Sequence, residues 1–154
     1  MANVLIGSYT ARLDTSGRIK IPEKFREVIE QVYGKDVFVT SLSDDSIKIY
    51  PLSVWLSMTD LTAEGALHLR PDVRKFMLRV NRHGSRHELD SKGRVLISQA
   101  LREKAKLRDE VEVLGLSNHL EIWNKDVLDG TLEEKPLSDE DFESIARLIP
   151  RGKP

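Results

Sequence analysis

Cysteine is absent from the 154 residues of this sequence. Disulfides, thiolate metal sites and a cysteine nucleophile are therefore excluded together, and the composition fits a reducing compartment. Long hydrophobic runs are absent too, since nowhere do about 18 apolar residues follow one another. Residues 1–9 contain neither a basic region nor an apolar stretch of signal-peptide length. We therefore expect a cytoplasmic protein that neither spans a membrane nor is exported.

The motifs of common active sites are also missing. The sequence contains no G-x-S-x-G, P-loop, dinucleotide fingerprint or H-E-x-x-H. His83 and His87 have the i, i+4 spacing of two metal ligands on a helix, but Gly84 interrupts the segment and no third ligand is close in sequence. Solvent-exposed histidines are the simpler interpretation. We expect no enzyme activity, no metal, no cofactor and no small-molecule substrate.

The net charge of −1 gives no overall attraction to nucleic acid, but the charges are unevenly distributed. A basic surface can therefore exist on a nearly neutral protein, although a solvated helix face is the simpler interpretation of the run from Arg70 to Arg82. The clustered acids are Glu133, Glu134, Asp139, Glu140, Asp141 and Glu143. The clustered bases are Arg70, Arg74, Lys75, Arg79, Arg82, Arg86, Lys92, Arg94 and Arg102.

What the sequence does contain is one motif that occurs twice. Residues 13–27 and 89–103 share Leu, Asp, Gly, Arg, Ile, Arg and Glu at the same seven offsets. In both, a D-x-x-G-R turn precedes an I/V-x-I strand and the start of a helix. Chance does not produce this order twice, so the chain is an internal duplication.

Each copy predicts the order β-β-α-β-β. In the first, a hairpin turns at residues 14–17, where Gly17 can adopt the positive φ that other residues resist, and Pro22 opens the helix. In the second, the turn lies at residues 90–93 and Ser98 caps the helix. The predicted strands are 7–13, 18–21, 37–39, 47–50, 86–89, 94–97, 111–114 and 120–123, and the helices are 22–34 and 98–106.

Two further helices are predicted outside the copies. Apolar residues from Val73 to Val80 recur at helical spacing after Pro71. Ser138 can cap a terminal helix whose apolar face, with Phe142 and Ile149, is expected to pack against something. The predicted boundaries are 5–55 for the first repeat, 56–82 for a connecting helical segment, 83–127 for the second repeat, and 128–154 for a C-terminal helix and tail.

One unit of about 45 residues is too small to bury a sheet on both faces. The two copies are therefore expected to pair as a pseudo-two-fold barrel with flanking helices, in an α+β fold that is mainly β. Any edge strand that remains needs covering by a helix or by a neighbouring subunit.

The doubled D-x-x-G-R, the I/V-x-I that follows it, the element order and the chain length resemble the MraZ family of bacterial regulators. The resemblance covers nearly all of residues 5–127 and implies two AbrB/SpoVT-like swapped-hairpin units. It also implies sequence-specific binding to closely spaced double-stranded DNA repeats upstream of the division and cell-wall gene cluster. A ring-shaped homo-oligomer and a nucleoid-associated location follow from the same resemblance.

The resemblance implies a DNA-contacting surface at the two turns, in the segments from Asp14 to Arg18 and from Asp90 to Arg94. An arginine just beyond a tight turn can enter a groove and pair with guanine or hold a phosphate. Because a carboxylate repels phosphates, Asp14 and Asp90 are expected to form the turns instead. The expected DNA-binding residues are Thr15, Ser16, Gly17, Arg18, Ser91, Lys92, Gly93 and Arg94.

Alternatives remain at this point. The Asp and Arg of each turn can bond across it and only shape the fold, which would fit a non-catalytic oligomeric structural or interaction protein. Ser16 stands where the second copy has Lys92, so the first turn is expected to bind phosphate more weakly. The repeated Arg26 and Arg102 are expected in helix-surface salt bridges.

Overall fold

The structure, a computed structural model, describes residues 4–60 and 69–149. Residues 61–68 of the predicted connecting segment and 150–154 of the predicted tail lie outside the described residues. The strands are β1 (Leu5–Arg12), β2 (Arg18–Lys20), β3 (Asp36–Thr40), β4 (Ile47–Pro51), β5 (Ser85–Glu88), β6 (Arg94–Leu96), β7 (Glu110–Ser117) and β8 (Leu120–Trp123). The helices are α1 (Glu23–Val28), η1 (Ile29–Tyr33), α2 (Leu52–Met58), α3 (Pro71–Arg82), α4 (Gln99–Lys104), α5 (Lys125–Glu134) and α6 (Asp139–Leu148).

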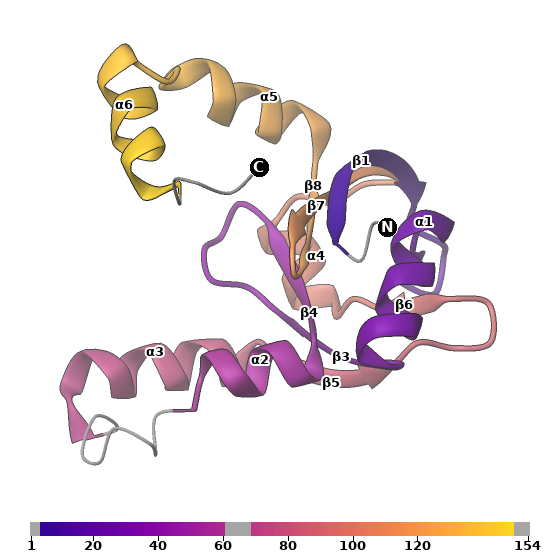
Figure 1. Cartoon of the computed structure of the whole chain (residues 1–154). Helices are drawn as coiled ribbons and strands as arrows, with labels where there is room; N and C mark the ends of the chain where they lie inside the picture. The colour runs from indigo at the N-terminus through magenta and orange to yellow at the C-terminus, as the bar shows by residue number, and fades with distance from the viewer. Residues whose placement is uncertain (1–3, 61–68, 150–154) are drawn as a thin grey trace.

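A six-stranded antiparallel sheet with the order β1-β7-β8-β4-β3-β5 forms the centre of the molecule (Figure 1). The equivalent strands of the two copies are β1 and β5, β3 and β7, and β4 and β8. Replacing each strand by its equivalent gives the same order read in reverse, so the sheet is pseudo-symmetric. Each copy lends its first strand to the other, because β1 pairs with β7 and β5 pairs with β3. The central pair, β4 with β8, joins the copies in the middle of the sheet.

A smaller sheet contains β2 and β6, which pair with each other over three residues each. The central residues Ile19 and Val95 are buried, so their neighbours in each strand point to the opposite, outer face. Each strand begins directly after one of the repeated turns. We call β2, β6 and these two turns, residues 14–20 and 90–96, the paired-turn ribbon.

The predicted α+β class is confirmed, but the predicted closed barrel is wrong. Strands β1 and β5 are the two edges of an open sheet, so the described strands do not close on themselves. The hairpins predicted at the two repeated turns do not form ladders. Across the first turn, β1 and β2 are joined by a single bridge between Leu13 and Ile19, whereas their ladders are with β7 and β6.

The main core lies between the sheet and the repeated helices. Both copies contribute to it, with Phe25 and Ile29 from α1 and η1 and Leu101 from α4 all buried. A second, smaller cluster contains Phe38, Tyr50, Trp55 and Val80, and it attaches α2 and α3 to the other end of the sheet. The predicted connecting helix is therefore confirmed in α3.

The C-terminal region differs from expectation. It forms two helices, α5 and α6, which extend away from the sheet (Figure 1). Ser138 caps α6 as predicted, with its side chain accepting from Asp141 N–H at 3.1 Å. The predicted packing of α6 stays a prediction, because every residue from 139 to 149 is exposed in this single chain. Within the described ranges, no helix combines the length and the apolar character needed to cross a membrane.

Candidate nucleic-acid interface

The two repeated turns have the same backbone geometry. In the first, Asp14 N–H donates to the Arg18 carbonyl at 2.9 Å and Gly17 N–H donates to the Asp14 carbonyl at 3.1 Å. In the second, the equivalent bonds from Asp90 and Gly93 measure 3.1 and 2.9 Å. Gly17 and Gly93 have φ angles of +84° and +74°, the left-handed region that a side chain disfavours. The duplicated sequence therefore builds the same turn twice.

Each aspartate carboxylate bonds the backbone of its own turn. Asp14 Oδ1 accepts from the N–H groups of Ser16 and Arg18, both at 2.9 Å, and from Ser16 Oγ at 2.6 Å. Asp90 Oδ1 accepts from the N–H groups of Lys92 and Arg94 at 2.9 and 2.8 Å. Such bonds to the charged form favour ionisation. The Ser16 hydroxyl and the Arg18 N–H hold the pKa of Asp14 below its ordinary value. Bonds from Arg94, first of all its backbone N–H, lower the pKa of Asp90 to about 2.

The two arginines of the turns have different partners. Arg94 Nε donates to Asp90 Oδ2 at 2.8 Å, and its Nη1 lies 3.8 Å from Asp14 Oδ2 in the other turn. Arg18 Nη1 donates to the neutral Ser16 hydroxyl at 3.1 Å. Both side chains are partly exposed. Arg94 is thus held between two carboxylates, whereas Arg18 is held by one hydroxyl.

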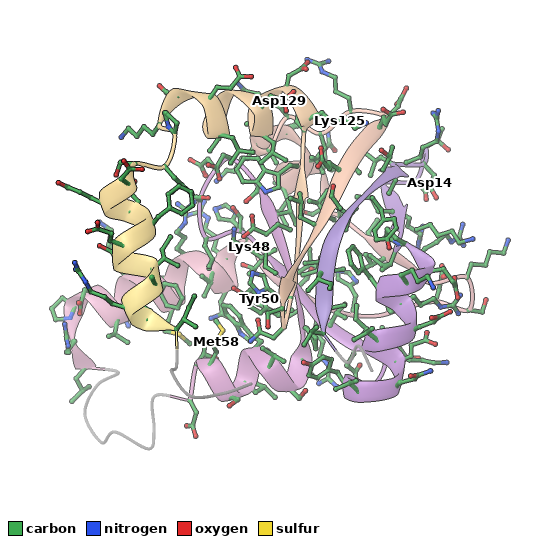
Figure 2. The ribbon with its side chains drawn as sticks, turned by 45° about the horizontal axis from the view of Figure 1, so that its top comes forward. Asp14, Lys48, Tyr50, Met58, Lys125 and Asp129 are labelled. Carbon is green, nitrogen blue, oxygen red and sulfur yellow. The ribbon has the colours of Figure 1, made fainter. Side chains whose placement is uncertain are left out.

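The expected DNA-binding residues separate by exposure. Thr15, Ser16, Ser91 and Lys92 are exposed, so their side chains are accessible to a partner. Gly17 and Gly93 are buried, and their N–H groups already donate within the turns. Asp14 lies at the periphery beyond the end of β1, whereas Lys48 lies in the middle of the sheet (Figure 2).

Lys20 is a surface cation that the sequence reasoning missed. It is exposed and pairs directly with Arg94 across the ribbon. Alternation along β2 places Lys20 on the same outer face as Arg18, and this signal was available in the R-I-K-I string. Like charges directly opposite on a sheet destabilise it, and an anion bound between them would relieve the repulsion. The outer face of the ribbon therefore carries three cations.

The helix arginines Arg26 and Arg102 lie beneath the turns. Arg26 on α1 donates from Nη2 to the Ser91 carbonyl at 3.0 Å, so it supports the turn of the second copy. Its side chain lies 2.6 Å from the position that a Cβ atom on Gly93 would occupy. Arg102 on α4 lies in the same way against Gly17 of the first copy, at 3.1 Å. Each copy thus supports the turn of the other.

The predicted salt bridge is confirmed for Arg26, whose Nε lies 3.1 Å from Glu30 on the next turn of helix. Arg102 Nε instead donates to the Ile97 carbonyl at 3.0 Å. The supporting contacts were not predictable from local spacing, because each joins residues of different copies. The signal that could have found them is the repetition of an arginine at the same offset from each turn.

His83 and His87, which have metal-ligand spacing in the sequence, each contact a polar side chain. His83 Nε2 lies 3.0 Å from Lys104 Nζ, and His87 Nε2 lies 2.7 Å from the Ser85 hydroxyl. Burial, and then the charge of Arg18, lower the pKa of His87. In the part of the chain that the structure describes, no group of three His, Cys, Asp or Glu side chains is placed to hold a metal ion.

Comparison with known protein sequences identifies relatives of this chain. Residues 81–147 match the family model described as "MraZ protein, putative antitoxin-like". The transcriptional regulator MraZ of Acidobacterium capsulatum is 35% identical over 142 residues, which cover 92% of this chain and 97% of that protein. The chain belongs to the MraZ family. The transcriptional regulator MraZ of Finegoldia magna is 32% identical over 90% of this chain and 94% of that protein. The transcriptional regulator MraZ of Syntrophobacter fumaroxidans is 34% identical over 93% of this chain and 92% of that protein.

The family membership supports a DNA-binding regulator of transcription, which is not an enzyme class. In each of these comparisons the match covers at least 90% of this chain and therefore extends over both copies of the repeated unit.

Proposed function

We propose that this chain binds DNA sequence-specifically through the paired-turn ribbon and thereby regulates transcription. The observation that carries the proposal is the outer face of this ribbon, where Arg18, Lys20 and Arg94 lie on two paired strands. A two-stranded antiparallel ribbon fits the major groove, where an arginine can pair with guanine O6 and N7. Exposed Thr15, Ser16, Ser91 and Lys92 are suited to phosphate contacts that position the ribbon.

Gly17 and Gly93 serve this site through their conformation. Their positive φ angles let each turn close, so that the arginine one residue later begins a strand at the surface. Asp14 and Asp90 fix the same turns from within. The glycines and the aspartates therefore shape the turns that present the contact residues of the ribbon.

The remaining features of the proposal rest on the family resemblance. The two interleaved copies correspond to a double AbrB/SpoVT-like swapped-hairpin unit, with repeats at 5–55 and 83–127. The DNA target is a set of closely spaced promoter repeats at the division and cell-wall gene cluster, and the chain acts as a ring-shaped homo-oligomer associated with the nucleoid. Few phosphates are contacted per subunit, so simultaneous binding to several repeats would raise the apparent affinity.

A gel-shift titration with a repeat-bearing duplex tests the proposed surface. The Arg18→Ala, Arg94→Ala double variant is expected to lose affinity and to show a shallower dependence on salt, because cations that displace counterions are removed. Arg12→Ala is the matched control, since Arg12 is 78% exposed on β1 but lies outside the ribbon. Equal affinity of the double variant and the wild type would refute the contact surface.

The second candidate is an oligomeric structural or interaction protein. It is favoured by the Asp90–Arg94 bond of 2.8 Å, which occupies Arg94 within its own turn. This alternative predicts negligible salt dependence of any nucleic-acid binding, whereas the DNA-binding function predicts a steep one.

A further inference from the structure

Helix α6 is an amphipathic helix whose apolar face is left exposed by the described residues of this chain. Phe142, Ile145 and Leu148 are 58%, 44% and 81% exposed, and Ile149 just beyond the helix is 60% exposed. A ten-residue helix is marginal in water on its own, even with the capping box of Ser138 and Asp141. The apolar face therefore needs a partner surface.

Helix α3 presents a second uncovered face. Its inner side is anchored by Val80, which is buried in the smaller core cluster. On its outer side, Leu78 is 56% exposed and forms a shallow groove of about 560 Å³ with Met77. Arg74 and Arg82 line the same groove, so its apolar base lies between two cations.

The two faces carry opposite charge. Helix α3 contains four basic residues and one acid, a net charge of +3, whereas α6 contains four acids and one arginine, a net charge of −3. Acidic residues beside the apolar face of α6 can therefore meet the arginines beside the groove of α3. Complementary charge of this kind sets the orientation of a contact and excludes wrong partners.

We propose that α6 of one copy packs in the groove on α3 of a neighbouring copy. Within one chain the two faces do not cover each other, because every residue of α6 is exposed and Leu78 is exposed as well. Figure 1 shows the two helices apart, with α6 at the far end of the α5 arm. Because the contact joins two different surfaces, it propagates from copy to copy and forms a ring when the rotation closes.

This inference rests on the proposed homo-oligomer and names its interface. Two double variants of the full chain test the two surfaces one at a time. The first, Arg74→Glu with Arg82→Glu, changes the groove on α3, and the second, Phe142→Ser with Ile145→Ser, changes the apolar face of α6. All four side chains point away from the core, so the fold is expected to persist, which circular dichroism and thermal unfolding verify. Sedimentation velocity without DNA should show an assembly for the wild type and particles near 17.5 kDa for each variant.

Mixing the two variants gives the sharper readout. Each retains one intact surface, so an equimolar mixture should form heterodimers of one copy of each and nothing larger. Lys24→Glu with Arg108→Glu reverses two exposed charges elsewhere and should leave the assembly intact. Wild-type mass in either interface variant, or a mixture that stays monomeric, would overturn the inference, as would a wild type that is itself monomeric.

The same samples distinguish failure of the interface from failure of the proposed function. An assembled wild type that fails to shift a repeat-bearing duplex would refute DNA binding while leaving the α3–α6 contact in place. Conversely, interface variants that retain full assembly while the wild type binds DNA would refute the contact alone.

Discussion

Arg18 and Arg94 occupy equivalent positions in the two copies, yet their surroundings make them unequal. Arg94 is held by Asp90 at 2.8 Å and faces Asp14 at 3.8 Å, so binding an anion would compete with two carboxylates. Arg18 has the Ser16 hydroxyl as its hydrogen-bond partner. The sequence difference at Ser16 and Lys92 predicts a weaker first turn, whereas the structure makes the first arginine the less restrained of the two.

We therefore expect Arg18→Ala to weaken DNA binding more than Arg94→Ala. Loss of a bidentate arginine contact with a base costs about 1–3 kcal/mol, and the loss should be smaller for Arg94 because its partner carboxylates already occupy it. Gel-shift affinities of the two single variants at matched salt measure the difference. Thermal unfolding provides the complementary readout, since Arg94→Ala also removes a bond that holds its turn. Equal losses of affinity would contradict the proposed asymmetry.

At the scale of elements, the supporting contacts of the turns cross between the copies. Helix α1 of the first copy carries Arg26, which bonds the turn before β6, and α4 of the second carries Arg102 beneath the turn before β2. Two backbone hydrogen bonds also join one copy to the turn of the other. Ile21 N–H donates to the Gly93 carbonyl and Ile97 N–H donates to the Gly17 carbonyl, both at 2.9 Å. Neither turn is therefore supported by its own copy alone.

Because each helix arginine supports the turn of the other copy, removing it should affect the turn of the other copy and not the turn next to it in sequence. Arg26→Ala should speed amide hydrogen exchange in the second turn, at Lys92 and Arg94, while leaving the first turn nearly unchanged. A hydrogen bond from a charged group contributes about 1.5–3 kcal/mol, so an increase of about tenfold or more is expected. Glu30→Gln is the matched control, because it removes the Arg26–Glu30 ion pair without removing the contact of Arg26 to Ser91. Faster exchange confined to the first turn would contradict the crossed arrangement.

The sequence predicts elements better than their pairing, for a physical reason. Turn residues such as Gly17 and cap residues such as Ser138 act within a few positions, so their effects can be read locally. The pairing of β1 with β7 joins residues about a hundred positions apart, and a turn that looks like a hairpin does not reveal that its strands pair elsewhere. Likewise, the apolar stripe of α6 predicts a helix but not whether the covering surface belongs to the same chain.

At the scale of the whole molecule, the two copies meet in the sheet where β4 pairs with β8. Lys48 lies opposite Glu121 at this junction, with Nζ and Oε2 2.6 Å apart and both side chains largely buried. Burial alone would raise the pKa of Glu121, but bonds from His119, Lys48 and Trp123 outweigh it and lower this pKa to about 2. The ionised carboxylate therefore binds Lys48 across the junction, and it also holds Trp123 of its own strand and His119 just before that strand.

Glu121→Gln should destabilise the whole chain at neutral pH, by about 1–3 kcal/mol, because it leaves the Lys48 ammonium without its buried counter-charge. The folded pKa of Glu121 lies below its ordinary value of 4.5, so its contribution is present above that value and is lost as the pH falls toward 2. The difference in unfolding free energy between wild type and variant should therefore shrink between pH 4.5 and 2, as urea titrations at several pH values would measure. Glu112→Gln on neighbouring β7, whose carboxylate bonds the exposed Ser8 hydroxyl, serves as the control and should change stability little. A difference for Glu121→Gln that stays constant over this range would mean that its charge does not stabilise the junction between the copies.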